Sequence, residues 1–404
     1  MGIDAETTMK AETDELPHEI MELQMGPSHP ATHGTIKFNL KLEGEKVLDC
    51  DVEVGFLHRG FDKSCEQATW TQVIPYTDRL NYASSLINNV GYALAVEKLI
   101  GVETPPRCQF IRVIVSELAR IFDHLTCCGM AASELGAITV GFYMIEAREM
   151  IMRIIETLTG ARLTVTYVRI GGVKHDLPQG FAESVTQAFK TIRKLLDDCD
   201  RLVSGNRIFI DRMSNVGTIS QETAVSYCLT GPILRATGVN YDVRKAYPYL
   251  VYDQLAFDIP LGTRGDNYDR FVCRIQEIGQ SMRIVEQALA KLPVGSVWIE
   301  DPRFVLPEKE KVYNSIEGLM HHFKIIMEGI HVPPGETYSA VEGGNGELGF
   351  YIVSDGGGRP YRVRVRPPCF IAMGAFHQMI KGYMIADIIP TFGMINMIGG
   401  ECDR

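Results

Sequence analysis

The chain has 404 residues, of which 46% are hydrophobic, and a formal net charge of −10 at pH 7. Its length is sufficient for about two sub-structures with sizeable cores, and its acidic balance argues against a nucleic-acid surface, which would need a basic patch. Its longest apolar runs fall well short of the roughly 20 residues that span a bilayer, so we expect any membrane association to be peripheral.

The N-terminal part of the sequence divides into two regions. Residues 1–24 carry many acidic and few large apolar side chains, so we expect an acidic tail that is disordered or docks on a partner. Residues 25–76 are expected to be β-rich, because residues 36–42 and 48–54 alternate apolar and polar side chains on either side of a turn, as in a β-hairpin.

A loop with two histidines, Gly-Pro-Ser-His-Pro-Ala-Thr-His-Gly at 26–34, precedes this hairpin. Its prolines exclude helix and regular strand, so His29 and His33 lie in a shaped loop. Imidazole is the side chain that ordinarily titrates near physiological pH, so a proton-handling role is one hypothesis. The alternative is a surface turn whose histidines have no chemical role.

Residues 77–330 are expected to form a helical bundle, because apolar residues recur there every three to five positions. We expect Asp78 to cap the first helix, with Tyr82 in its first turns, and Glu134 to open the third. The other helices are expected near 105–125, 181–203, 267–292 and 309–328.

Residues 331–404 are expected to form a C-terminal β element and a terminal helix, with strands at 348–353 and 361–365 and the helix at 370–388. Residues 344–349 fit G-x-G-x-x-G, but a strand pattern follows where the dinucleotide fingerprint requires a helix. We therefore expect a hairpin turn and no NAD binding. Arg362, Arg364 and Arg366 share one strand face, which is either solvated or a docking surface for an acidic partner.

Cysteine usage bears on metal chemistry. The ten cysteines include no C-x-x-C pair, and we find no signal peptide ahead of them, so we expect reduced thiols in a cytoplasmic protein. His29 and His33 have no further Cys or His close by in sequence, so we expect no metal site in this chain.

Six sequence blocks occur in series: residues 26–34, the His-Arg-Gly at 58–60, the Asp-Arg-Leu-Asn-Tyr at 78–82, the Gly-Ala-Arg at 160–162, the Arg-Ile-Gly-Gly-Val at 169–173 and the Gly-Glu-Cys-Asp-Arg at 400–404. In these blocks and their order, the sequence resembles the D-subunit family of proton-pumping NADH-quinone oxidoreductase, respiratory complex I. The resemblance covers nearly everything after about residue 20. It implies an α+β, predominantly α fold like the large subunit of nickel-iron hydrogenases, with an N-terminal β-rich part, a long helical bundle and a C-terminal β-hairpin and helix.

The resemblance also implies catalytic residues and a substrate. His33 and Tyr82 are expected to bind the quinone head group and donate protons to it, and Glu134 is expected to pair with His33. Two-electron reduction builds negative charge on both quinone oxygens, and an imidazolium and a phenol can each supply a proton there. No residue of this chain is expected to hold a cofactor, an iron-sulfur cluster or a metal.

The expected partners are other subunits of the complex: an iron-sulfur small subunit that supplies the electrons, the C subunit, and membrane subunits at the quinone entrance. The expected location is the cytoplasmic side of the bacterial cell membrane, as a peripheral protein. The alternative function is the large subunit of a membrane-associated nickel-iron hydrogenase. It is disfavoured because that enzyme needs two C-x-x-C pairs.

Three positions depart from the family pattern. Glu134 replaces the usual aspartate, Asn396 replaces a common aspartate, and Thr164 replaces a histidine that many members place near the neighbouring cluster. Threonine cannot take up a proton with the cluster's electron, so we expect a low-potential cluster. That favours menaquinone over ubiquinone as the substrate.

Overall fold

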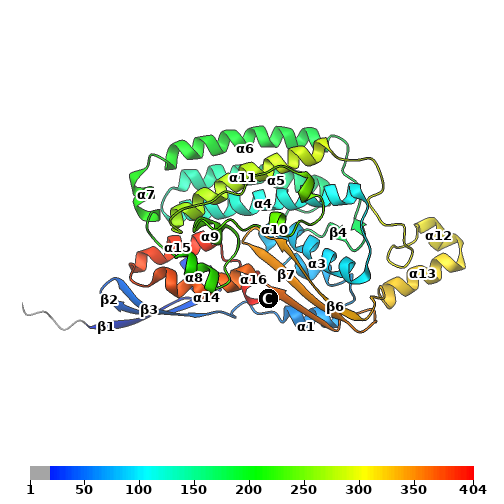
Figure 1. Ribbon diagram of the computed structural model, residues 1–404, viewed down its shortest axis with the longest axis horizontal. Helices are drawn as coiled ribbons and strands as arrows, with labels where there is room; N and C mark the ends of the chain where they lie inside the picture. The colour runs from blue at the N-terminus through cyan, green and yellow to red at the C-terminus, as the bar shows by residue number, and fades with distance from the viewer. Residues whose placement is uncertain (1–18) are drawn as a thin grey trace, which may run out of the picture.

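The structure, a computed structural model, describes residues 19–404 (Figure 1). Long helices form the upper body of the molecule as it is drawn there, and the sheets lie below them. The long helices are α3 (Ser85–Ile100), α4 (Pro106–Glu134), α5 (Ile138–Thr159), α6 (Phe181–Val203) and α11 (Asn267–Ala290). The central helix is α4, which contacts α3, α5, α11 and the C-terminal α15 (Ile388–Ile395). A mixed α+β fold, mainly α, is confirmed.

The N-terminal sheet has three antiparallel strands in the order β1 (Ile20–Met25), β2 (Lys37–Glu43) and β3 (Lys46–Glu53). The β2–β3 pair is the predicted hairpin. The expectation of a disordered or docking tail is wrong for residues 20–24, because they pair with β2 along its free edge. The acidic composition of this segment could not reveal the strand, because β1 is held by backbone hydrogen bonds to β2. The rest of the predicted tail lies outside the described residues.

Two predicted helix starts are wrong. Asp78 does not cap α3, because it follows the short α2 (Ile74–Thr77). Its carboxylate instead accepts hydrogen bonds from the side chains of Asn89 and Thr166. Tyr82 begins a 3-10 turn, η2 (Tyr82–Ser84), which the Asn81 side chain caps by accepting from the next turn's backbone N–H groups.

Glu134 ends α4 rather than opening α5. The chain turns at Gly136, whose φ of +87° is a conformation that favours glycine. The helix expected at 309–328 is divided into α12 (Lys309–Asn314) and α13 (Ile316–Met327), since Ser315 leaves the helical conformation and caps α13.

The C-terminal sheet has the order β6 (Gly335–Glu342), β7 (Glu347–Ser354) and β8 (Arg362–Arg366), all antiparallel. The glycine run closes the β6–β7 hairpin, as predicted. Arg362 and Arg364 form ion pairs with Glu66 and Asp62 of α1 (Phe61–Gln67), so much of this arginine face is paired within the chain.

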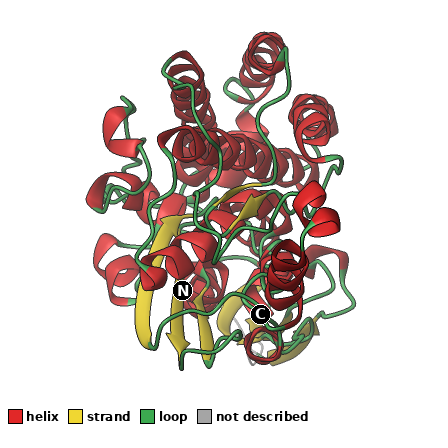
Figure 2. Ribbon diagram, turned by 90° about the vertical axis from the view of Figure 1, so that its right-hand side faces the viewer, coloured by secondary structure: helices red, strands yellow, loops and turns green. Residues whose placement is uncertain are grey.

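The terminal helical region contains α14 (Pro368–Ile380), α15 and α16 (Gly399–Asp403) instead of the single helix predicted at 370–388. The remaining short elements are β4 (Val168–Arg169), β5 (Gly172–Val173), α7 (Arg207–Met213), α8 (Gln221–Ser226), α9 (Gly231–Ala236), α10 (Val243–Ala246), and the 3-10 turns η1 (Pro30–Thr32), η3 (Tyr252–Gln254) and η4 (Ile385–Asp387). Seen from the end of the molecule, most strands lie in the lower half of the view, with helices above and beside them (Figure 2).

The apolar residues form two cores. One fills the helical body and extends to the C-terminal sheet, and the other lies between the N-terminal sheet, α14 and α15. The second core fixes the histidine loop against α15. Within residues 19–404, no helix is both long and apolar enough to cross a membrane.

Candidate active site

The histidine loop has a defined shape that its own side chains maintain. Nδ1 of His29 accepts from the backbone N–H of Ala31 at 3.2 Å, so this histidine caps η1. Thr32 is buried, and its hydroxyl lies 3.1 Å from the carbonyl oxygen of Pro27. At the end of η1, His33 adopts a left-handed conformation with φ 52°. The loop therefore uses His29 for its own structure and turns His33 away from it.

His33 lies beside Glu134, as the resemblance implied. Its Nε2 is 3.2 Å from Oε1 of Glu134, and the two side chains are 38% and 19% exposed. The imidazole ring also packs edge-on against Phe392 of α15, with ring centroids 5.0 Å apart. The second oxygen of Glu134 is buried and has no hydrogen-bond partner in the described part of the chain. Glu134 therefore has one interaction with His33 and spare acceptor capacity.

Tyr82 reaches the surface from the 3-10 turn before α3. The residue is 43% exposed, and its hydroxyl has no hydrogen bond to any of residues 19–404. Burial of the ring, followed by the nearby charge of Asp123, raises the pKa of Tyr82. The phenol thus stays protonated at neutral pH and its O–H is free to donate to a ligand.

Asp123 of α4 supports the turn that carries Tyr82. Its two oxygens accept from Asn396 at 2.8 Å and from Asn81, the neighbour of Tyr82, at 3.3 Å. Asp123 and Glu134 are eleven residues apart on the same helix, which is about 16 Å along its axis. The structure does not bring His33 and Tyr82 into direct contact, but places each beside a different acid of α4.

A second buried acid lies near Asp123. Glu401 of α16 is 2% exposed, and the thiol of Cys369 lies 3.1 Å from its Oε2. Burial, together with the charge of Asp123, raises the pKa of Glu401 to about 7. Sequence reasoning missed both Glu401 and Asp123.

The blocks at 58–60, 78–82 and 400–404 meet in space. The Asp403 carboxylate accepts from the backbone N–H groups of Gly55 and Leu57 at 2.9 and 2.7 Å. Arg59 then donates to the carbonyl oxygens of Arg79 and Gly400 at 2.8 and 3.3 Å. The chain terminus therefore holds the segment before Arg59 in place.

The block at 78–82 also meets the segment that contains Thr164. The fully buried Asp78 accepts short hydrogen bonds from Asn89 and Thr166, and burial raises its pKa to about 6. Thr164 itself is half-buried with φ 52°. These bonds hold the Thr164 segment against the turn that precedes Tyr82.

A buried ion network lies deeper, between α4, α11 and the β6–β7 hairpin. Glu277 contacts both His124, at 2.8 Å, and Arg235, at 2.7 Å. Burial alone would raise the pKa of Glu117, but Arg120 and Arg244 lower it to about 2. A sequence signal existed: within the mainly apolar middle of α4, Glu117, Arg120 and His124 recur at spacings of three and four, which places them on one helix face. The network members are Glu117, Arg120, His124, Arg235, Asp242, Arg244, Arg274, Glu277 and Glu342.

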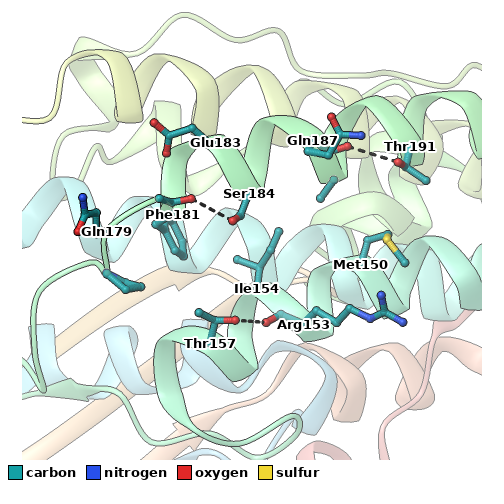
Figure 3. A pocket seen from close by; sticks show the side chains of 13 residues that line it. Met150, Arg153, Ile154, Thr157, Gln179, Phe181, Glu183, Ser184, Gln187 and Thr191 are labelled. Atoms are coloured by element: carbon teal, nitrogen blue, oxygen red, sulfur yellow. Dashed lines mark hydrogen bonds between the residues drawn. The ribbon is translucent and has the colours of Figure 1, made fainter.

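A groove between α5 and α6 has a volume of about 490 Å³ (Figure 3). The hydroxyls of Thr157, Ser184 and Thr191 each donate to a backbone carbonyl one turn earlier in their own helix. None of the candidate residues lines this groove, so it is not part of the candidate site.

The described residues contain no group of three or more His, Cys, Asp or Glu side chains that could hold a metal ion. All ten cysteines are free, and nine of them are buried. The geometry offers a tyrosine and a histidine–carboxylate pair at the surface of a mainly helical α+β protein.

Comparisons with known proteins identify the family. The family model described as respiratory-chain NADH dehydrogenase, 49 Kd subunit, matches residues 134–404. The chain is 57% identical to the first of the NADH-quinone oxidoreductase D subunits of Sorangium cellulosum, over 98% of each chain. It is 53% identical to the D subunit of Myxococcus xanthus, over 95% of this chain and 92% of the relative. A C/D subunit of Bdellovibrio bacteriovorus is 50% identical over 97% of this chain and 70% of its own length.

The chain therefore belongs to the D-subunit family of NADH-quinone oxidoreductase, and the resemblance drawn from the six blocks is confirmed. It is one subunit of a multi-subunit oxidoreductase. The hydrogenase alternative is not favoured.

Proposed function

We propose that this chain forms the face of the complex on which quinone is reduced, and that His33 and Tyr82 donate the two protons. The observation that carries the proposal is the pair of surface-reaching donors, one held at 3.2 Å from Glu134 and the other with an unoccupied hydroxyl among the described residues. The contacts within the chain therefore leave both side chains able to donate a proton to a ligand.

Reduction of a quinone to a hydroquinone takes two electrons and two protons. Tyr82 gives the phenol proton to one carbonyl oxygen, and the protonated His33 gives an N–H proton to the other. Because the pKa of Tyr82 is raised, the phenolate left behind is strongly basic and recaptures a proton readily. Loss of the His33 proton leaves Glu134 without a cationic partner, so donation releases this pair.

The electrons come from an iron-sulfur cluster in a neighbouring small subunit, since the ten cysteines of this sequence form no cluster-binding motif. Both donors are partly exposed, so other subunits must complete the chamber around the quinone. We expect the C subunit and membrane subunits among these partners, and the relative named as a C/D subunit supports the proximity of the C subunit. This arrangement would hold the chain at the cytoplasmic face of the cell membrane as a peripheral protein. Menaquinone is the proposed substrate because Thr164 cannot take up a proton with the cluster's electron.

The test uses the purified complex with His33→Ala and Tyr82→Phe combined. We expect loss of quinone reduction, with electron transfer from NADH to an artificial acceptor retained. Quinone reduction at the parental rate in an intact complex would refute the proposal.

A further inference from the structure

The α12–α13 hairpin stands out from the body at the end of the molecule opposite the N-terminal sheet (Figure 1). Neither helix contains a buried residue. Helix α13 is twelve residues long, about 18 Å, and is apolar along much of its length. A helix of this composition ordinarily has a buried face.

Six of the seven large apolar residues of α13 lie on its outer side. The outward stripe has the 3–4 spacing of a helix-packing face, with exposures between 49% and 77%, and consists of Ile316, Leu319, Met320, Phe323, Ile326 and Met327. The positions turned toward the body are Gly318, His321, His322 and Ile325, which are the less exposed ones. The apolar face of α13 is thus turned to solvent, whereas an amphipathic helix on a protein surface ordinarily turns this face to the protein body.

The hairpin has a fixed conformation. The Ser315 hydroxyl accepts from the N–H of Gly318 at 3.0 Å and caps α13. His321 makes a short hydrogen bond to the carbonyl oxygen of Pro302. The stripe is therefore presented on a preformed element, which lowers the entropy cost of binding.

A cavity of about 440 Å³, lined mainly by apolar residues but also by Thr69, Thr71, Gln72 and Arg169, opens at the base of α13. Its apolar lining includes Trp298, Phe304, Leu306, Ile325, Ile326 and Ile330. Ile326 belongs to both the cavity and the stripe, so the two form one continuous surface. Such a cavity can accept one bulky apolar anchor from a partner.

The size and charge of the surface indicate what covers it. Six such side chains, each half to three-quarters exposed, present on the order of 700 Å² of mainly apolar surface, which is close to one side of a standard protein interface and above the patches usual on a monomer. Residues 300–328 carry six acidic and four basic side chains, an excess that disfavours an anionic lipid surface. The relatives are named as individual subunits of an oxidoreductase, so the chain has unlike partners.

From these observations we infer that the α13 stripe and the adjoining cavity are the docking site for an apolar helix of another subunit of NADH-quinone oxidoreductase, which inserts one aromatic or branched side chain into the cavity. The inference rests on the family of the chain and does not depend on the roles of His33 and Tyr82.

The test introduces charge into the stripe within the complex, as Leu319→Asp combined with Phe323→Asp. The matched control is Lys324→Asp, which places a carboxylate on the same helix outside the stripe. We expect the double variant to reduce the amount of fully assembled complex on native gels at least tenfold, and the control to assemble normally. Activity per assembled complex should be unchanged in both, whereas a failure of the proposed quinone site would leave assembly intact. Full assembly of the double variant would overturn the inference.

A photo-crosslinking residue in place of Leu319 in the intact complex provides a readout that does not depend on how the double variant folds. We expect a covalent adduct with a different subunit. An adduct with a second copy of this chain, an adduct with lipid, or no protein adduct would each overturn the inference.

Discussion

Nε2 of His33 lies 3.2 Å from Oε1 of Glu134, and this contact joins the N-terminal loop to the end of the central helix, 101 positions later in the chain. Glu134, which stands where the resemblance leads us to expect an aspartate, is one methylene longer than aspartate and reaches the imidazole. Its second oxygen is buried without a partner, so the carboxylate has no other described hydrogen bond that would offset loss of His33.

Glu134→Gln should keep the shape of this contact and remove its charge. A hydrogen bond to a charged group contributes about 1.5–3 kcal/mol, so we expect quinone reduction to fall about 10–100-fold. The measurement is the steady-state rate of quinone reduction by the purified complex. Glu134→Asp is the control, and it should retain more activity than the glutamine variant; equal loss in the two would show that the charge is not what matters.

The substitutions His33→Ala and His29→Ala should affect different properties of the complex. The structure gives His33 a contact with an acid at the surface, whereas Nδ1 of His29 caps η1. We therefore expect the first variant to lose quinone turnover and the second to lose mainly loop stability, about 1 kcal/mol for a cap. Kinetic titration with quinone and thermal unfolding of the complex separate the two effects. Identical turnover in complexes with equal assembly would contradict the distinction.

Tyr82→Phe removes one hydroxyl and almost no volume. A general acid typically contributes about 10²–10⁴-fold, and we expect a loss of quinone reduction in this range. Because no described residue bonds to this hydroxyl, its loss should leave the free energy of unfolding nearly unchanged. An unchanged rate with short-chain quinone would exclude Tyr82 as a donor.

The helices and hairpins that are periodic along the sequence were predictable, and the start of α6 at Phe181 and of α11 at Asn267 agree with the structure. The helix starts assigned to Asp78 and Glu134 were wrong, because both acids satisfy distant partners rather than their own helix ends. Strand β1 was missed since its bonds come from β2 and not from its own side-chain pattern.

The candidate site likewise contains residues that the sequence could identify and residues that it could not. His33, Tyr82 and Glu134 could be nominated from motifs, and their catalytic roles remain predictions. Asp123 and Glu401 could not be nominated, because their significance comes from long-range contacts with Asn396 and Cys369 that only the fold creates. The outward apolar stripe of α13 has a periodicity typical of a core helix, and only the structure shows that it faces solvent.

Thr164 predicts the behaviour of the neighbouring cluster. Threonine has no proton to exchange near neutral pH, so the cluster that faces this subunit should have a low and nearly pH-independent potential. Full coupling of one proton to one electron would give about 59 mV per pH unit. An EPR-monitored redox titration of the complex across pH measures the slope. A slope near the full value would remove the support for menaquinone that Thr164 provides.

Glu401 predicts a specific pH dependence of stability. Burial raises its pKa from 4.5 to about 7 in the folded chain, so the folded state binds this proton more tightly than the unfolded state does. The contribution to stability is fully present below about pH 4.5 and is lost as the pH rises through 7. Relative to Glu401→Gln, the wild-type chain should therefore lose about 3 kcal/mol of unfolding free energy between these limits.

Urea unfolding of the full chain at several pH values, for wild type and Glu401→Gln, tests this dependence. Other titrating groups are common to both proteins and cancel in the difference between their unfolding free energies. If the Glu401→Gln difference were flat between pH 5 and 8, Glu401 would be ionised in the folded chain throughout this range, which would contradict the raised pKa.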